Sequence, residues 1–191
     1  MSRPAVFLDR DGTLIEERGF IDRLDMVTIY PWTGDALRLL KRAGFVAVVV
    51  TNQSAIARGM IEEPFLHEVH RAIDAHITAA GGAIDRYYFC PHLPESTIDK
   101  YRATCTCRKP GPGLIEQACQ DMDLDPARSV MVGDRWLDVA CGRAAVYALV
   151  PVVPSVGGLF ALINESWLLW DPRRQCLHDK AAGTVVVKRV A

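Results

Sequence analysis

The sequence predicts an α/β protein, a Rossmann-like three-layer sandwich in which helices cover both faces of a mainly parallel sheet. Two observations predict this fold class. Short, β-branched apolar runs alternate with amphipathic segments along the first 150 positions, and such alternation is typical of βαβ units. Clusters of polar residues follow several of the apolar runs, as happens where the strands of such a sheet end beside a ligand site.

Four elements are expected in the first 80 residues. Residues 5–8 are an apolar run typical of a buried strand. Between residues 34 and 44, apolar side chains recur at helical spacing, with an acidic residue in the first turn and basic residues near the end. Residues 45–50 are apolar and rich in valine, which predicts a second buried strand. An apolar stripe over residues 65–77, followed by two glycines, predicts a second helix.

The same alternation continues in the second half of the chain. Residues 84–89 suit a third strand and residues 114–122 a third helix. A fourth strand is expected at 129–132, and a further helix at 137–145. Two strands on either side of a helix-length connection favour a parallel arrangement, so these elements extend the same sheet.

The pattern changes after about residue 150. We expect residues 151–191 to form a C-terminal extension of a core that spans about residues 4–150. Within the extension, residues 159–163 and 167–170 are a candidate hairpin, and residues 185–187 are a candidate last strand.

The composition limits the classes of protein that fit. The 191 residues, 50% of them hydrophobic, suffice for one substantial core, so we expect a single domain over residues 1–191. Lys and Arg number 22 against 23 Asp and Glu, which supplies no basic field for nucleic acid. No apolar run reaches the roughly 18 residues of a membrane span, and the N-terminus lacks a secretory signal. We therefore expect a cytoplasmic monomer with neither a membrane nor a nucleic-acid partner.

The first chemical motif, Asp9-Arg10-Asp11-Gly12-Thr13, directly follows the first expected strand. Two carboxylates one residue apart can divide the work of phosphoryl transfer. One attacks phosphorus, while the other, held protonated, donates a proton to the leaving oxygen and afterwards deprotonates water. An acidic turn that caps a helix is the alternative, but the apolar strand before the motif favours the catalytic interpretation.

Further polar residues are expected at three other strand ends. Thr51 and Asn52 offer a hydroxyl and backbone N–H groups to phosphate oxygens, and Lys109 offers a compact cation that offsets phosphoryl charge. Asp134 and Asp138 add two carboxylates, which with the first pair would surround Mg²⁺, a cation that prefers oxygen ligands. Each residue alone is ordinary, but their order along one chain favours a common site.

These motifs resemble the signature of the haloacid dehalogenase superfamily of phosphohydrolases. Asp-x-Asp-Gly-Thr, a strand-end Thr, a Lys and Gly-Asp-x-x-x-Asp occur here in the same order. The resemblance implies that Asp9 is the nucleophile and Asp11 the general acid and base. It further implies that Thr51 binds phosphate with its neighbour Asn52, and that Lys109 stabilises charge.

The same resemblance implies a magnesium site. Asp134 would bind Mg²⁺ together with Asp9 and the carbonyl oxygen of Asp11. Asp138 matches the second acid of the last motif, and its spacing leaves open whether it binds the metal directly or through water.

A second site is expected at Cys90-Pro-His92 and Cys105-Thr-Cys107. Three thiols and one imidazole complete a tetrahedral Zn²⁺ site, and a closed set of four protein ligands indicates a structural role. Reduced cysteines in a plain loop are the alternative, although the polar segment between the two pairs offers little core to hold such a loop. The remaining cysteines are assigned to packing: Cys119, Cys141 and Cys176.

Residues 51–59, the Cys-Pro-His segment and residues 105–113 narrow the resemblance to the subfamily that contains heptose bisphosphate phosphatases and histidinol phosphatases. The subfamily implies that there is no large cap domain and that the substrate is a small phosphorylated sugar. Because a guanidinium grips phosphate bidentately, two arginines, Arg58 and Arg108, are candidates to hold a second phosphate. The candidate substrate-binding residues are Asn52, Gln53, Arg58, Arg108 and Arg135.

Three alternatives remain open at this point. A histidinol-phosphate phosphatase would carry the same catalytic set. A polynucleotide 3′-phosphatase also shows a Thr-Asn-Gln segment, but the near-neutral charge and the expected zinc loop count against it. A non-catalytic phosphate-binding scaffold would predict a damaged set of carboxylates, whereas Asp9, Asp11 and Asp134 are all present.

Overall fold

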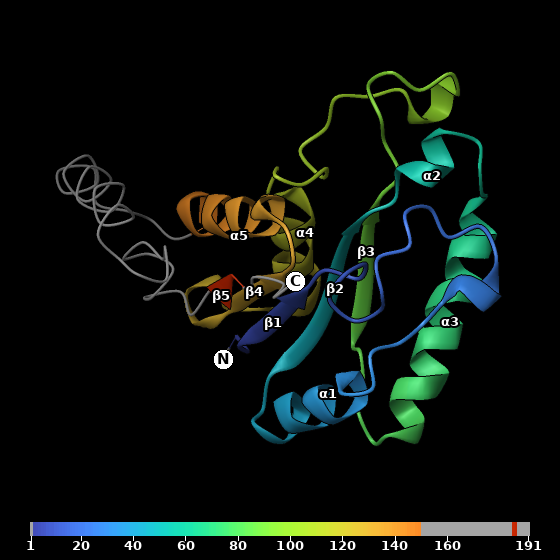
Figure 1. Cartoon of the computed structure of the whole chain (residues 1–191). Helices are drawn as coiled ribbons and strands as arrows, with labels where there is room; N and C mark the ends of the chain where they lie inside the picture. The colour runs from blue at the N-terminus through green and yellow to red at the C-terminus, as the bar shows by residue number, and fades with distance from the viewer. Residues whose placement is uncertain (1, 150–184, 187–191) are drawn as a thin grey trace, which may run out of the picture.

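A computed structural model describes residues 2–149 and 185–186 of the chain. Five strands form one sheet in the order β3-β2-β1-β4-β5, and every neighbouring pair is parallel (Figure 1). The strands are β1 (Ala5–Leu8), β2 (Val46–Asn52), β3 (Arg86–Cys90), β4 (Val130–Gly133) and β5 (Val185–Val186). The predicted parallel sheet is therefore confirmed.

Helices cover both faces of the sheet. On one face α1 packs against α3, and on the other α4 packs against α5 (Figure 1). The helices are α1 (Thr33–Arg42), α2 (Ser54–Ala57), α3 (Glu63–Ala79), α4 (Gly113–Met122) and α5 (Trp136–Leu149). Short 3₁₀ helices occur at η1 (Leu24–Met26), η2 (Asp99–Tyr101) and η3 (Pro126–Arg128).

The apolar runs of β1 and β2 are continuous because both faces of these two strands are buried. In β1, Ala5 and Phe7 belong to the core cluster that includes α4 and α5. Val6 and Leu8 belong to the cluster that includes α1 and α3. Successive side chains of a strand point to opposite faces, so a strand between two helical layers needs an apolar residue at every position. The predicted three-layer sandwich is confirmed.

Several boundaries differ from those that the sequence predicts. The third strand begins at Arg86 rather than at residue 84 and continues through Cys90. The second strand continues through Asn52, which pairs with Cys90. Of the expected last strand at 185–187, Val185–Val186 pairs with β4, and the candidate hairpin at 159–170 lies outside the described residues.

The placement of Lys109 at a strand end was wrong. Lys109 lies in the loop before α4, because the sequence that follows it, Pro-Gly-Pro, has two residues without a backbone donor and cannot pair in a sheet.

Within residues 2–149 and 185–186, no helix combines the length and the apolar character needed to cross a membrane. Cys119 and Cys141 are buried in the core as expected, while Cys176 lies outside the described part of the chain.

Candidate active site

The polar residues that follow three separate strands meet in one pocket at the carboxyl edge of the sheet. This carboxylate pocket has a volume of about 270 Å³. Asp9 follows β1, Thr51 and Asn52 end β2, and Asp138 lies in the first turn of α5, just after β4. The predicted site residues that line the pocket are Asp9, Asp11, Thr51, Asn52, Gln53, Arg108, Lys109, Arg135 and Asp138.

Asp9 is only 8% exposed, and one of its two carboxylate oxygens is held by neighbours. The backbone N–H of Arg10 donates to Oδ1 at 2.8 Å, and the ammonium of Lys109 lies 2.8 Å from the same oxygen. Burial raises the pKa of Asp9 to about 6, against the opposing charge of Lys109 and with a smaller contribution from Asp138. Oδ2 is therefore the oxygen left for a reaction partner.

Lys109 is buried between two carboxylates. Its Nζ donates to Asp138 Oδ1 at 2.6 Å and to the carbonyl oxygen of Val50 at 2.9 Å, besides its ion pair with Asp9. Burial alone would lower the pKa of Lys109, but the charges of Asp9 and Asp138 outweigh burial and raise it. The lysine is therefore a fixed cation at the floor of the pocket.

The side-chain amide of Asn52 holds the backbone of Lys109 at both ends. Asn52 Oδ1 accepts from the Lys109 N–H at 2.9 Å, and Asn52 Nδ2 donates to the Lys109 carbonyl at 3.1 Å. The predicted substrate-binding residue Asn52 thus fixes a lysine that lies on a loop, and Asn52 also lines the pocket.

Asp11 and Gln53 are joined to an arginine that the sequence analysis did not single out. Gln53 Nε2 donates to Asp11 Oδ2 at 2.9 Å and to Thr51 Oγ1 at 2.9 Å. Arg10 forms a salt bridge to Asp11 and also reaches Gln53. The buried position of Arg10, 2% exposed, depends on residues more than forty positions away, so no local signal reveals it.

Three carboxylates come close enough to share one cation. Oxygens of Asp9, Asp134 and Asp138 all lie within 4.8 Å of one another. Asp134 Oδ1 is buried and accepts no hydrogen bond in the described part of the chain, and a buried carboxylate oxygen without a donor favours a bound cation. These residues fit Mg²⁺, which takes hard oxygen ligands.

Two glycines make room for this cluster. A Cβ added to Gly12, whose φ is +79°, would lie 2.4 Å from Asp134 Oδ2. A Cβ added to Gly133 would lie 2.3 Å from the carboxyl carbon of Asp138. Both glycines therefore allow carboxylates to fold against the backbone of the strand ends.

The three candidate arginines differ in position. Arg108 and Arg135 line the carboxylate pocket. Arg108 donates to the carbonyl of His92 at 3.2 Å, and Arg135 forms a 2.9 Å ion pair with Glu17. Arg58 is exposed and is not among the lining residues; its guanidinium lies 5.3 Å from the ring centroid of Phe20, which does line the pocket.

The predicted zinc ligands form a second cluster. The Sγ atoms of Cys90, Cys105 and Cys107 are 3.1–3.6 Å apart, and His92 Nδ1 lies 3.3 Å from Cys107 Sγ. These separations are too long for disulfides, and they bring the four donor atoms close enough to bind one ion with Zn–S bonds of about 2.3 Å. The donor set of three sulfurs and one imidazole fits Zn²⁺.

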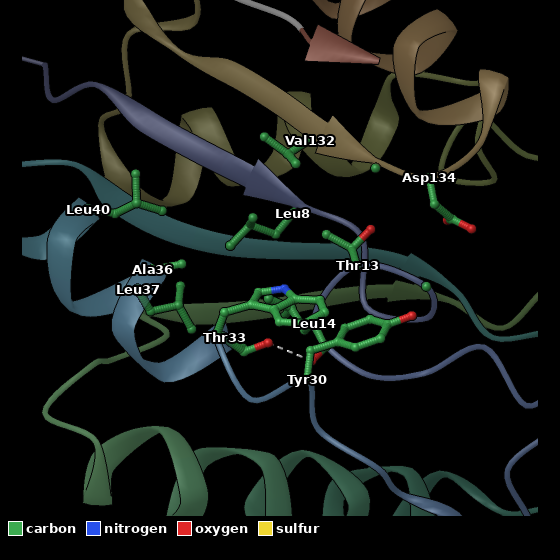
Figure 2. Close-up of a pocket in the computed structure, with 13 residues that line it drawn as sticks. Leu8, Thr13, Leu14, Tyr30, Thr33, Ala36, Leu37, Leu40, Val132 and Asp134 are labelled. Carbon is green, nitrogen blue, oxygen red and sulfur yellow. Dashed lines mark hydrogen bonds between the residues drawn. The ribbon is translucent and has the colours of Figure 1, made fainter. Parts of the chain in front are cut away.

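A separate apolar pocket of about 400 Å³ lies on the α1 side of β1 and β4. Figure 2 shows its wall of leucine, valine and alanine side chains, with Thr33 donating to the Leu14 carbonyl at 2.8 Å. Asp134 lines this pocket and not the carboxylate pocket, although its carboxylate lies close to Asp9 and Asp138. Among the described residues that line it there is no Lys or Arg to bind a phosphoryl group, so the carboxylate pocket is the better candidate for the active site.

The fold and the carboxylate pocket define a hydrolase of the haloacid dehalogenase-like (HAD-like) class. A family model described as HAD-hydrolase-like matches residues 106–152. The D-glycero-beta-D-manno-heptose-1,7-bisphosphate 7-phosphatase of Yersinia pestis is 42% identical over 75% of this chain and 77% of that protein. Its counterpart in Escherichia coli K12 is 40% identical over 75% of each chain. The chain therefore belongs to this family of HAD-like phosphatases.

Solved structures agree with this membership. A protein from Mesorhizobium loti described as a HAD-like phosphatase superposes with a TM-score of 0.72 at 31% identity, over 75% of this chain and 69% of that chain. The D,D-heptose 1,7-bisphosphate phosphatase of B. bronchiseptica, solved with magnesium and phosphate, has a TM-score of 0.66 at 30% identity, over 74% of this chain and 76% of that chain. The predicted superfamily and the predicted class, a phosphoric monoester hydrolase, are confirmed.

The cysteine cluster can be tested by metal content. We expect Cys107→Ser to remove most of the bound zinc and to lower the free energy of unfolding by more than about 2 kcal/mol, as loss of a structural metal does. Cys119→Ser is the matched control, since Cys119 lies in the core outside the cluster. Elemental analysis and urea unfolding provide the measurements. Equal zinc content in both variants would contradict a zinc site.

The raised pKa of Asp9 predicts how stability depends on pH when magnesium is absent. The pKa lies at about 6 in the folded chain against an ordinary value of 3.8, so the folded state binds this proton more tightly. Ionising Asp9 therefore costs stability as the pH rises from about 4 to about 6. Asp9→Asn has no such proton, and we expect it to be more stable than the wild type by up to ~3 kcal/mol at pH 7, with little difference at pH 4.

Urea unfolding across this pH range, in buffer without magnesium, measures that difference. Asp25→Asn is the control, because the Asp25 side chain is 78% exposed and its loss should change stability by less than about 1 kcal/mol. An Asp9→Asn variant that is less stable than the wild type at pH 7 would contradict the assignment.

Proposed function

We propose that the chain is a magnesium-dependent phosphatase that removes the C7 phosphate of D-glycero-D-manno-heptose 1,7-bisphosphate through a phosphoaspartyl intermediate. The product would serve the synthesis of nucleotide-activated heptose. One observation of the site carries the chemical part of this proposal: Asp9 is buried with Oδ1 fixed by Lys109 and Oδ2 left for attack. The names of relatives about 40% identical over three quarters of the chain support the choice of substrate.

The residues suggest how the phosphate is transferred. Oδ2 of Asp9 attacks phosphorus, and the bond from phosphorus to the C7 oxygen breaks. The ammonium of Lys109 offsets the charge that gathers on the nucleophile and the phosphoryl oxygens. Thr51 offers its hydroxyl to one of those oxygens. Mg²⁺ bound at Asp9, Asp134 and the Asp11 carbonyl would neutralise phosphoryl charge and favour the ionised form of the nucleophile.

Asp11 completes the reaction in two proton transfers. It donates its proton to the C7 oxygen as the sugar leaves, so that a neutral hydroxyl forms instead of an alkoxide. It then accepts a proton from the water that attacks the phosphoaspartyl group, which returns Asp9 as a carboxylate and releases phosphate. Asp138, whose oxygens accept from Lys109 and from the Arg135 N–H at 3.0 Å, keeps the lysine in place.

A panel of substrates tests the proposed function. We expect kcat/KM with Mg²⁺ to be about a hundredfold higher for an anomer of heptose 1,7-bisphosphate than for fructose 1,6-bisphosphate, histidinol phosphate or a 3′-phosphorylated oligonucleotide. That ratio corresponds to about 2.7 kcal/mol of transition-state discrimination. Asp9→Asn should abolish turnover of every member. Preference for histidinol phosphate would overturn the sugar assignment and leave the chemistry intact.

Arg108 is the proposed ligand of the second phosphate. It lines the carboxylate pocket, and we expect Arg108→Ala to raise KM for the bisphosphate by about tenfold or more, the loss of one charge-assisted contact. KM for a monophosphate should change much less. Arg58→Ala is the comparison, since Arg58 lies outside the pocket lining. Equal effects of Arg108→Ala on both substrates would remove the proposed role.

A further inference from the structure

We infer that Arg10 and Gln53 are positioning residues that aim the carboxyl group of Asp11 at the leaving oxygen and fix the hydroxyl of Thr51. Both are almost fully buried, at 2% and 5% exposure. Arg10 comes from the turn after β1, whereas Gln53 follows β2. The inference rests on the proposed function, in which Asp11 is the proton donor.

The planar guanidinium of Arg10 hydrogen-bonds to both carboxylate oxygens of Asp11. Its Nε lies 3.1 Å from Oδ1 and 3.2 Å from Oδ2, and its Nη2 donates to Oδ1 at 2.9 Å. A planar fork restricts the rotation of a carboxylate as well as its position. Oδ2 also accepts from Gln53 Nε2 at 2.9 Å. Both oxygens of Asp11 are thus held from two directions.

Arg10 also fixes the orientation of the Gln53 amide. Arg10 Nη2 donates to Gln53 Oε1 at 3.1 Å, and a guanidinium has no acceptor, so the amide must present its oxygen to Arg10. The NH₂ group then faces Asp11 and Thr51. The two donors of that group reach Asp11 Oδ2 and Thr51 Oγ1, both at 2.9 Å.

This orientation decides how Thr51 meets the phosphate. Because Thr51 Oγ1 accepts a hydrogen bond from Gln53, its own O–H is directed elsewhere and is available to a phosphoryl oxygen. Thr51 is 1% exposed, so its hydroxyl has few other choices. The buried amide of Gln53 therefore fixes the positions of both the proposed proton donor, Asp11, and a proposed phosphate ligand, Thr51.

In its surroundings, Arg10 pairs its positive charge with the carboxylate of Asp11. Asp11 is the carboxylate partner of Arg10 in the described part of the chain, and Arg10 Nη1 is buried there without a hydrogen-bond partner. Behind the guanidinium, burial first and the charge of Arg10 second lower the pKa of His70 to about 3. His70 is therefore neutral at ordinary pH, and it brings neither a rival anion nor a second cation.

The test distinguishes two roles for Arg10 and Gln53: positioning Asp11 as a proton donor, or only stabilising the fold. A sugar phosphate expels an alkoxide that needs a proton, whereas p-nitrophenyl phosphate expels a phenolate that does not. Arg10→Lys keeps the charge and loses the fork, and Gln53→Met keeps the volume and loses the amide. For both variants, loaded with Mg²⁺, we expect kcat on heptose 1,7-bisphosphate to fall by about 10- to 100-fold, with KM changed by less than about threefold.

Single-turnover release of p-nitrophenol, with enzyme in excess, measures transfer of the phosphate to Asp9 alone. Here we expect each variant to lose at least about threefold less than it loses on the heptose bisphosphate: a partial loss remains because Thr51, a phosphate ligand, is no longer fixed, but the phenolate needs no proton donor. Arg23→Lys is the matched control, because Arg23 pairs with Asp25 at the surface, where its side chain is 69% exposed. This control should leave both rates unchanged.

Each outcome bears on the inference. Equal losses for the two leaving groups, or no loss for either, would overturn it, and if Arg10→Lys does not fold, Gln53→Met decides. A wild type that hydrolyses fructose 1,6-bisphosphate but not the heptose bisphosphate would refute the proposed substrate only. The same comparison of leaving groups would then be made with the alkyl phosphate that is turned over.

Discussion

The site depends on one buried cation, Lys109, held between the carboxylates of Asp9 and Asp138. The two acids are 8% and 1% exposed, and a buried carboxylate without a counter-charge costs several kcal/mol. Lys109 supplies that charge from a loop, which by itself would position it poorly. The amide of Asn52 corrects this by binding the lysine backbone at both ends. Asn52, at the end of β2, thus fixes the position of the loop that carries Lys109.

The cysteine cluster acts on the same loop from the other side. Cys90 ends β3 opposite Asn52 in the sheet register, and Cys107 stands two residues before Lys109. A four-ligand metal site would therefore tie the loop to the sheet at a strand that neighbours the one carrying Asn52. The proposed zinc ligands supply no reactive group, but a metal bound there would limit where Lys109 can lie and so would affect the proposed catalysis.

The sequence predicts those parts of the molecule that depend on local pattern. The central strands are recognisable since both faces are buried, and Asp9 and Asp134 are recognisable since they follow such strands. Arg10 was missed because an arginine between two acids looks solvated, and its burial depends on Gln53, a partner 43 residues away. Arg58 stays a predicted phosphate ligand, and the sequence gives no sign that its guanidinium lies 5.3 Å from the ring centroid of Phe20.

Asp134 and Asp138 show how chain geometry gives different tasks to chemically equal groups. Asp134 keeps a buried oxygen without a donor in the described residues, so it is open to a cation. Asp138, in the first turn of α5, turns back over Gly133, and both of its oxygens accept hydrogen bonds. Its charge is thereby committed to Lys109, and through the lysine it sets the position of Asp9. A second acid four residues after the first therefore helps to position the proposed nucleophile, whether or not it would also contact a bound cation.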